Sequence, residues 1–223
     1  MSLLAGKRVV DLTRRLTPGA EGFKLCLRSF FVDELLPGFH RPPGQWYIMQ
    51  EWEVSSHIGT HVEAPYHHIR EGADVSQLEL SRLMGEAVVL DLRRKGAGEA
   101  IDVGDVEATG SDIRPGDIAL IHTGFDRCYG QPGYDRPYLT LEAVRWLVER
   151  GIVCLGIDAS GIEKYKAEEQ PGHLLLFAHG IPIIEELTHL EELRQRRAFF
   201  MALPLPIRGA DACPVRAIAI EEA

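Results

Sequence analysis

Several features that mark particular protein classes are missing from this 223-residue chain. Its four cysteines lie far apart and form no Cys-x-x-Cys pair, so neither a zinc knuckle nor a disulfide framework is predicted. No uninterrupted apolar run reaches about 18 residues, and the N-terminal one is too short for a signal peptide. We therefore expect a soluble, cytoplasmic protein whose cysteines are reduced thiols.

Positive charge and nucleotide-binding motifs are also scarce. The 24 basic residues are outnumbered by 33 acidic ones, and the net charge of −9 would repel a phosphate backbone. The chain has no Gly-x-Gly-x-x-Gly sequence and no Walker loop, which argues against a nucleotide cofactor. It also lacks a Gly-x-Ser-x-Gly elbow, which argues against a serine hydrolase. The expected partner is a small-molecule substrate, and binding to a nucleic acid or a membrane is not expected.

What the chain does contain is typical of a globular protein. Apolar residues make up 45% and charged residues 26%, and the length favours one domain spanning residues 1–223. Short apolar runs rich in Val, Ile, Leu and Phe predict buried strands. They lie at 8–12, 87–92, 118–122, 152–157, 199–203 and 217–220. Many are continuous rather than alternating, as in strands that are covered on both faces.

Helices are predicted at fewer places. Thr140 is a good N-cap for a helix over 141–150, which Gly151 would end. A second helix is predicted over 185–195, and a short turn or helix over 172–177. Because strands outnumber helices, the expected fold is α/β or α+β, with a mixed sheet that curls toward a barrel.

The distribution of histidine is the most informative feature. Four of the nine histidines, His57, His61, His67 and His68, fall within twelve residues. The spacing of His57 and His61 would suit one face of a helix, but Gly59 between them favours a bent strand or loop. His61 and Glu63 point the same way if their segment is extended. Two imidazoles and a carboxylate from one short segment are suitable ligands for a divalent first-row metal, although a polar loop is the alternative.

A second group of candidate ligands lies nearer the C-terminus. It contains His173 and Glu185, with His179 between them. Taken alone, His173 is explained as a helix cap, and Glu185 as a favourable charge at the start of the predicted helix. Together with the first group, they would complete a coordination sphere or hold a second metal.

The first group carries a recognisable signature. The sequence His57-x-Gly-Thr-His61-x-Glu63-x-Pro-x-His67 resembles the motif His-x-Gly-Thr-His-x-Asp-x-Pro-x-His of the metal-dependent cyclase/hydrolase family, which includes kynurenine formamidases and isatin hydrolases. Further blocks at 10–19, 156–160, 180–185 and 202–217 are similar to family blocks, so the resemblance extends over nearly the whole chain.

The resemblance implies a fold and a role for each matching position. The implied fold is an α/β arrangement around a mixed, barrel-like sheet with flanking helices, in a homodimer or homotetramer. His57, His61 and Glu63 would be metal ligands, and His173 and Glu185 would complete a two-zinc site in which Glu63 and Glu185 bridge. His67 would be the catalytic proton donor and acceptor. Relatives of the isatin hydrolase type imply a single manganese instead.

One departure from the motif concerns the metal. Glu63 stands where the family usually has aspartate, and its extra methylene moves the carboxylate by about an ångström, whereas metal–ligand distances tolerate about 0.2 Å. Either the backbone shifts to compensate, or Glu63 binds one ion rather than bridging two. The number of ions, one or two, and their identity, zinc or manganese, are therefore both open.

The chemistry that fits these residues is metal-assisted hydrolysis. A bound ion would lower the pKa of its water and polarise a carbonyl, while His67 transfers protons to and from the reacting groups. The best candidate substrate is an aryl formamide such as N-formylkynurenine, an intermediate of tryptophan catabolism. A cyclic amide like isatin or a lactone is the alternative substrate. A different class of function, a non-catalytic metal-binding protein on the same scaffold, is disfavoured by the presence of His67.

Overall fold

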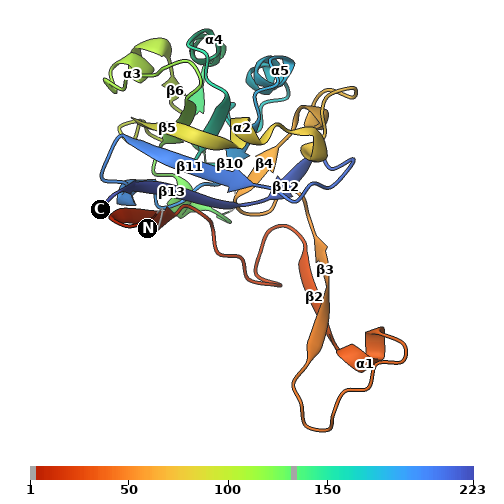
Figure 1. Cartoon of the computed structure of the whole chain (residues 1–223). Coiled ribbons are helices and arrows are strands. Elements are labelled where there is room, and N and C mark those ends of the chain that lie inside the picture. The colour runs from red at the N-terminus through yellow and green to blue at the C-terminus, as the bar shows by residue number, and fades with distance from the viewer. Residues whose placement is uncertain (1–3, 132–134) are drawn as a thin grey trace.

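The computed structural model describes residues 4–131 and 135–223. Its centre is one curved, mixed sheet with the strand order β1-β13-β11-β5-β7-β9-β10-β4-β12 (Figure 1). These strands are β1 (Lys7–Asp11), β4 (His61–Glu63), β5 (Met84–Asp91), β7 (Ile118–His122), β9 (Cys154–Ile157), β10 (Ile183–Glu185), β11 (Arg197–Leu203), β12 (Ala212–Pro214) and β13 (Arg216–Glu222). The curved mixed sheet confirms the predicted barrel-like α/β class.

All six strands predicted from apolar runs lie in this sheet. Strands β5, β7 and β9 form its parallel centre, and their side chains alternate between two apolar clusters, one on each face of the sheet. Leu90, Ile121 and Leu155 belong to the cluster on one face, while Ile118 and Leu120 belong to the other. Burial on both faces explains why these runs read as continuous rather than alternating.

Helices cover one side of the sheet, as Figure 1 shows for α3 (Val103–Glu107), α4 (Leu141–Glu149) and α5 (Pro171–Ala178). The predicted cap of α4 is present, since the Ala143 N–H donates to the hydroxyl of Thr140. A short helix α2 (Leu80–Leu83) precedes β5, and single 3₁₀ turns occur at η1 (Pro65–His67), η2 (Val75–Gln77), η3 (Asp126–Cys128) and η4 (Leu190–Glu192). Within the described residues, no helix has the length and apolar character needed to cross a membrane.

The predicted helix over 185–195 is wrong. Glu185 ends strand β10, and the chain then continues irregularly to the single turn η4. Glu186 and His189 adopt positive φ angles of 55° and 58°, which a right-handed helix does not accommodate. The leucines that suggested a helical stripe, Leu187 and Leu190 among them, are instead buried in the core from this irregular segment.

A hairpin arm extends away from the sheet (Figure 1). It consists of β2 (Leu25–Phe31) and β3 (Ile48–Val54), paired antiparallel, with α1 (Val32–Leu35) between them. Trp46 and Trp52 on this arm are 78% and 70% exposed. A second small sheet pairs β6 (Ala100–Ile101) with β8 (Tyr138–Leu139). All four cysteines are free thiols, as expected from their spacing.

Candidate metal centre

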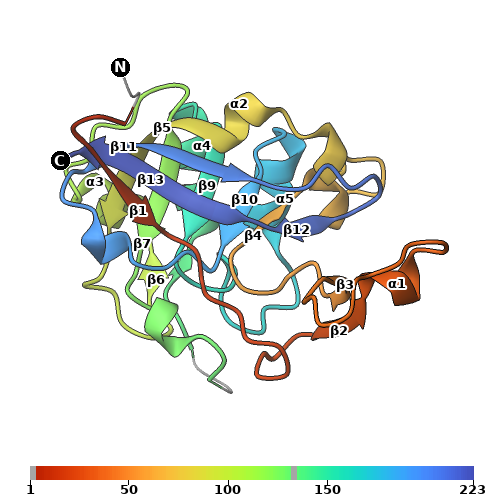
Figure 2. The same ribbon diagram turned by 60° about the horizontal axis from the view of Figure 1, so that its bottom comes forward.

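The register of two neighbouring strands brings the candidate ligands together. His61 and Glu63 are the first and last residues of β4, so their side chains point to the same face, as their spacing predicts. Strand β10 runs antiparallel to β4 and places Glu185 directly opposite His61. Helix α5 contributes His173. Figure 2 shows β4, β10 and α5 close together at one end of the sheet.

A tight turn positions His57. Gly59 has a positive φ of 56°, and a Cβ at this position would collide with the side chain of Leu16. This conformation is available to glycine at little cost. The turn leaves His57 Nδ1 at 2.9 Å from Glu63 Oε1 and 3.2 Å from His61 Nε2. The bent loop inferred from Gly59 is therefore confirmed.

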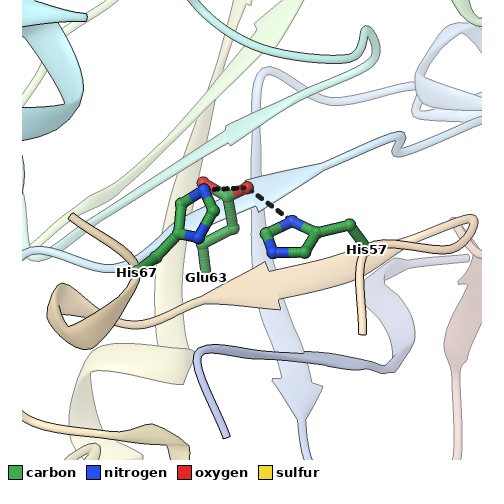
Figure 3. Close-up of side chains that lie close together, drawn as sticks. All are labelled: His57, Glu63 and His67. Carbon is green, nitrogen blue, oxygen red and sulfur yellow. Dashed lines mark ion pairs between the residues drawn. The ribbon is translucent and has the colours of Figure 1, made fainter. Parts of the chain in front are cut away.

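Glu63 occupies the centre of the cluster, with His57 and His67 on either side (Figure 3). Its Oε1 atom faces His57 and also lies 3.5 Å from His61 Nε2, while its Oε2 atom lies 3.3 Å from His173 Nε2. Glu185 lies between the same two histidines, with its Oε1 atom 3.5 Å from His173 Nε2 and its Oε2 atom 3.8 Å from His61 Nε2. All five predicted ligands thus converge, and both carboxylates extend between His61 and His173.

Each candidate histidine ligand is anchored through its other ring nitrogen. His57 Nε2 donates to Asp211 Oδ2 at 2.8 Å, and His173 Nδ1 donates to Glu163 Oε2 at 2.5 Å. His61 Nδ1 donates to the carbonyl of Gly59 at 2.8 Å. Such contacts are typical of metal-binding histidines, because they fix the tautomer and leave a lone pair facing the ion.

The centre therefore contains lone pairs that face one another. With the imidazole protons on the outer nitrogens, His173 Nε2 and Glu63 Oε2 are both acceptors, and Glu63 Oε2 is buried without a well-directed hydrogen bond. An arrangement of mutually facing acceptors is stable only with a cation or with extra protons among them. The residues fit a divalent metal, since imidazole and carboxylate are ligands for zinc and manganese.

The pKa values of the metal-free chain reflect the same crowding of acceptors. Burial lowers the pKa of His57, but the carboxylates of Glu63 and Asp211 outweigh it and raise this pKa to about 9. For His173, burial is likewise outweighed by Glu163, Glu185 and Glu63, which raise its pKa to about 12. Burial raises the pKa of Glu63, but its histidine neighbours hold it well below the usual range. Without an ion, protons compensate these carboxylates.

His67 lies beside the cluster in the turn η1. Its Nδ1 donates to the same Asp211 oxygen that anchors His57, at 3.1 Å, and its Nε2 lies 3.9 Å from Glu63 Oε1 (Figure 3). The side chain is partly exposed to the adjoining cavity. A carboxylate on Nδ1 leaves Nε2 free to accept a proton, which is the geometry of a general base.

Two further histidines that the sequence drew attention to lie outside the set of five converging ligands, although His68 packs against it. The ring of His68 stacks on that of His173, with centroids 5.1 Å apart, and it is not among the lining of the cavity. His179 follows α5 and donates to the carbonyl of Leu175.

The cluster opens into a cavity of about 440 Å³. Phe23 and Tyr129 are part of its wall, whereas Trp46, Tyr47 and Trp52 lie on the hairpin arm and do not line it. The hydroxyl of Tyr129 is held by Glu21, to which it donates at 3.1 Å. The volume is sufficient for a ligand of one or two rings.

Sequence reasoning missed the two anchoring carboxylates. Asp211 immediately precedes β12, which pairs with β4, and its carbonyl accepts from Ala64 N. Glu163 lies in a loop ten residues before His173 and also accepts from the His173 backbone N–H at 2.9 Å. Neither residue has a spacing relative to the motif that would reveal its role, because the contacts depend on strand pairing and loop course.

Comparisons with known proteins identify the relatives of this chain. Residues 10–164 match a family model described as "Putative cyclase". A kynurenine formamidase of Erythrobacter litoralis is 28% identical over 220 residues, which cover 95% of this chain and 93% of the relative. The structure of isatin hydrolase A from Ralstonia solanacearum is similar with a TM-score of 0.81 and 25% identity, covering 98% of this chain and 93% of that one. A structure described as a "potential metal-dependent hydrolase with cyclase activity" gives a TM-score of 0.77 and 26% identity, covering 97% and 99%.

Proposed function

The chain belongs to the cyclase family, and from this we propose that its single domain, residues 1–223, hydrolyses an aryl formamide such as N-formylkynurenine. Its homologues indicate a metal-dependent hydrolase that acts on C–N bonds other than peptide bonds. The observation that carries the proposal is the convergence of three anchored imidazoles and two buried carboxylates at the base of one cavity, next to a histidine with an open Nε2 atom.

We propose His57, His61, Glu63, His173 and Glu185 as the metal ligands. Two ions, zinc or manganese, are supported by the way both carboxylates extend between His61 and His173. The longer side chain of Glu63 is compatible with bridging, since its two oxygens already face different histidines.

A metal held by these residues would supply a more acidic bound water and polarisation of the scissile carbonyl. His67 is proposed as the catalytic residue. Its Nε2 takes the proton of the attacking water and returns it to the departing amine nitrogen, and Asp211 on Nδ1 stabilises the imidazolium that exists between these two steps.

A second candidate substrate is a cyclic amide of the isatin type, which is favoured by the similarity to isatin hydrolase A. The two substrates can be separated by measuring kcat/KM for N-formylkynurenine and for isatin with the same metal-loaded protein. A higher value for the formamide supports the proposal, and a higher value for isatin replaces it. No turnover of either, or of a lactone, would leave a metal-binding protein without hydrolase activity.

The metal is tested separately by plasma mass spectrometry on protein purified without a histidine tag or chelator. Two equivalents of zinc or manganese per chain are expected. One equivalent would favour a mononuclear site of the isatin hydrolase type. No metal after incubation with both ions would refute the mechanism.

We further propose a homo-oligomer, a dimer or tetramer, held together in part by the hairpin arm. The arm packs little of its surface against the rest of the chain and exposes Trp46 and Trp52, which another copy would cover. Sedimentation of the protein and of a Trp46→Ser, Trp52→Ser variant tests this, because the variant is expected to dissociate. The cytoplasmic location stays a prediction.

A further inference from the structure

The cavity above the metal centre has a cationic wall that the mechanism does not use. Arg136 lies just before β8, is only 7% exposed, and is among the residues that line the cavity. Its Nε atom donates to the carbonyl of Gly161 at 3.1 Å. This bond fixes the plane of the guanidinium group and leaves its two terminal nitrogens for other partners.

No carboxylate among the described residues lies within ion-pair distance of this guanidinium. The acidic groups that share the cavity have partners of their own. Glu163 accepts from His173, and Glu186 faces Arg14 at 3.7 Å. A buried guanidinium without a counter-ion is costly, so its retention at a cavity wall indicates an anion that arrives with the ligand.

Gly161 places this group next to the metal centre. Its φ is +87°, and a Cβ at this position would overlap Arg136 Nη2 while lying 3.7 Å from Glu185 Oε1. The guanidinium and the candidate ligand Glu185 therefore flank the same point of the cavity wall. A molecule with its amide at the centre and a short substituent can reach Arg136.

We propose that Arg136 binds a carboxylate of the substrate and so selects anionic aryl formamides over neutral ones, an inference that rests on the proposed function. A guanidinium matches a carboxylate with two parallel hydrogen bonds, which a neutral substituent cannot make. Lys164 and Lys166, also on the cavity wall and exposed, add positive potential at its entrance. The cavity thus favours an anion although the whole chain carries a charge of −9.

Two substrates that differ only in the carboxylate test this directly. N-formylkynurenine carries an α-carboxylate, and N-formylkynuramine lacks it. The wild-type protein is expected to favour the first in kcat/KM, and Arg136→Met is expected to reduce this preference about 10- to 100-fold, mainly through KM. Arg136→Lys, which keeps the charge without the planar fork, is expected to retain part of the preference. Arg145→Met, an exposed arginine on α4 outside the cavity, is the matched control and is expected to keep the full preference.

Equal losses on both substrates in Arg136→Met, with unchanged metal content, would overturn the proposal and make Arg136 a support for Glu185 or for the fold. An unchanged preference would overturn it as well. If Arg136→Met does not fold, Arg136→Lys decides, since an undiminished preference in that variant contradicts recognition by two parallel hydrogen bonds.

Failure of the proposed function is recognised separately. If the wild-type protein hydrolyses neither formamide, binding of 2-aminobenzoate and of its neutral analogue 2-aminobenzamide is measured by calorimetry. Tighter binding of the anion, lost in Arg136→Met, supports the anion site without the formamidase activity. Equal effects of the substitution on both ligands refute the site.

Discussion

Replacing Asp211 by asparagine should weaken two functions at once, because one oxygen of Asp211 anchors two histidines. Asp211 Oδ2 accepts from His57 Nε2 at 2.8 Å and from His67 Nδ1 at 3.1 Å. Asparagine has the same shape but no charge, and only one of its two terminal atoms can accept a hydrogen bond. The substitution therefore changes the electrostatics of the site with little change in packing.

The size of the effect follows from the exposure of the carboxylate. A hydrogen bond to a charged group contributes about 1.5–3 kcal/mol, and the Asp211 side chain is 36% exposed, so solvent screening favours the lower end. A loss of about 1.5 kcal/mol for each histidine corresponds to roughly tenfold. We expect Asp211→Asn to bind metal about tenfold more weakly through His57. At saturating metal, its kcat should fall about tenfold through His67.

Metal affinity is best measured by competition with a chelator at pH 9. The substitution also lowers the proton affinity of His57, and easier deprotonation of this histidine offsets part of the loss in metal affinity. At pH 9, which is about the pKa of His57 in the metal-free chain, His57 is already half deprotonated, so this offset is smaller. Asp91→Asn is the matched control, since Asp91 pairs with Arg93 at 2.6 Å and does not line the cavity. An Asp211→Asn protein with metal affinity and kcat both within about twofold of wild type would refute the reasoning.

Four further predictions concern the base, the protons released on metal binding, the pH dependence of stability and the fold. His67→Ala should lower kcat by about 10²- to 10⁴-fold with unchanged metal content, and loss of metal in this variant would make His67 a ligand instead. Burial lowers the pKa of His57, but Glu63 and Asp211 raise it to about 9. Zinc binding at pH 7 should therefore release at least one proton per chain, and zinc affinity should increase toward pH 9. Calorimetric heats that do not differ between buffers of different ionisation enthalpy would contradict this. The same raised pKa of His57 stabilises the fold of the metal-free chain. This contribution is fully present below pH 6.5, the ordinary histidine pKa, and is lost as pH rises through about 9. Thermal unfolding of the metal-free chain should therefore show lower stability at pH 10 than at pH 7. Asp158→Asn should reduce the free energy of unfolding by about 1–3 kcal/mol, because the buried carboxylate accepts from Thr123 Oγ1 and from the N–H groups of Thr123 and Gly124; an unchanged urea midpoint would show that these donors find other acceptors.

The sequence alone was sufficient for the parts of the site that depend on local geometry. His61 and Glu63 share a face because side chains alternate along a strand, and Gly59 permits the turn that returns His57 to them. The buried strands were likewise predictable, because apolar runs covered on both faces depend on composition. The helix expected over 185–195 failed, since the spacing of its leucines is also satisfied by an irregular segment with two residues at positive φ.

Other features of the site depend on long-range contacts that no spacing encodes. Glu185 faces His61 because β10 pairs with β4 in one register, and Asp211 reaches His57 because β12 pairs with the opposite edge of β4. Arg136 lies beside the centre only because a glycine 25 residues later leaves room for its guanidinium. Local sequence thus determined which chemical groups are present and how neighbouring side chains alternate. The tertiary structure decided which distant acceptor or cation each group meets, because hydrogen bonds and ion pairs act over a few ångströms and strand pairing determines which residues come that close.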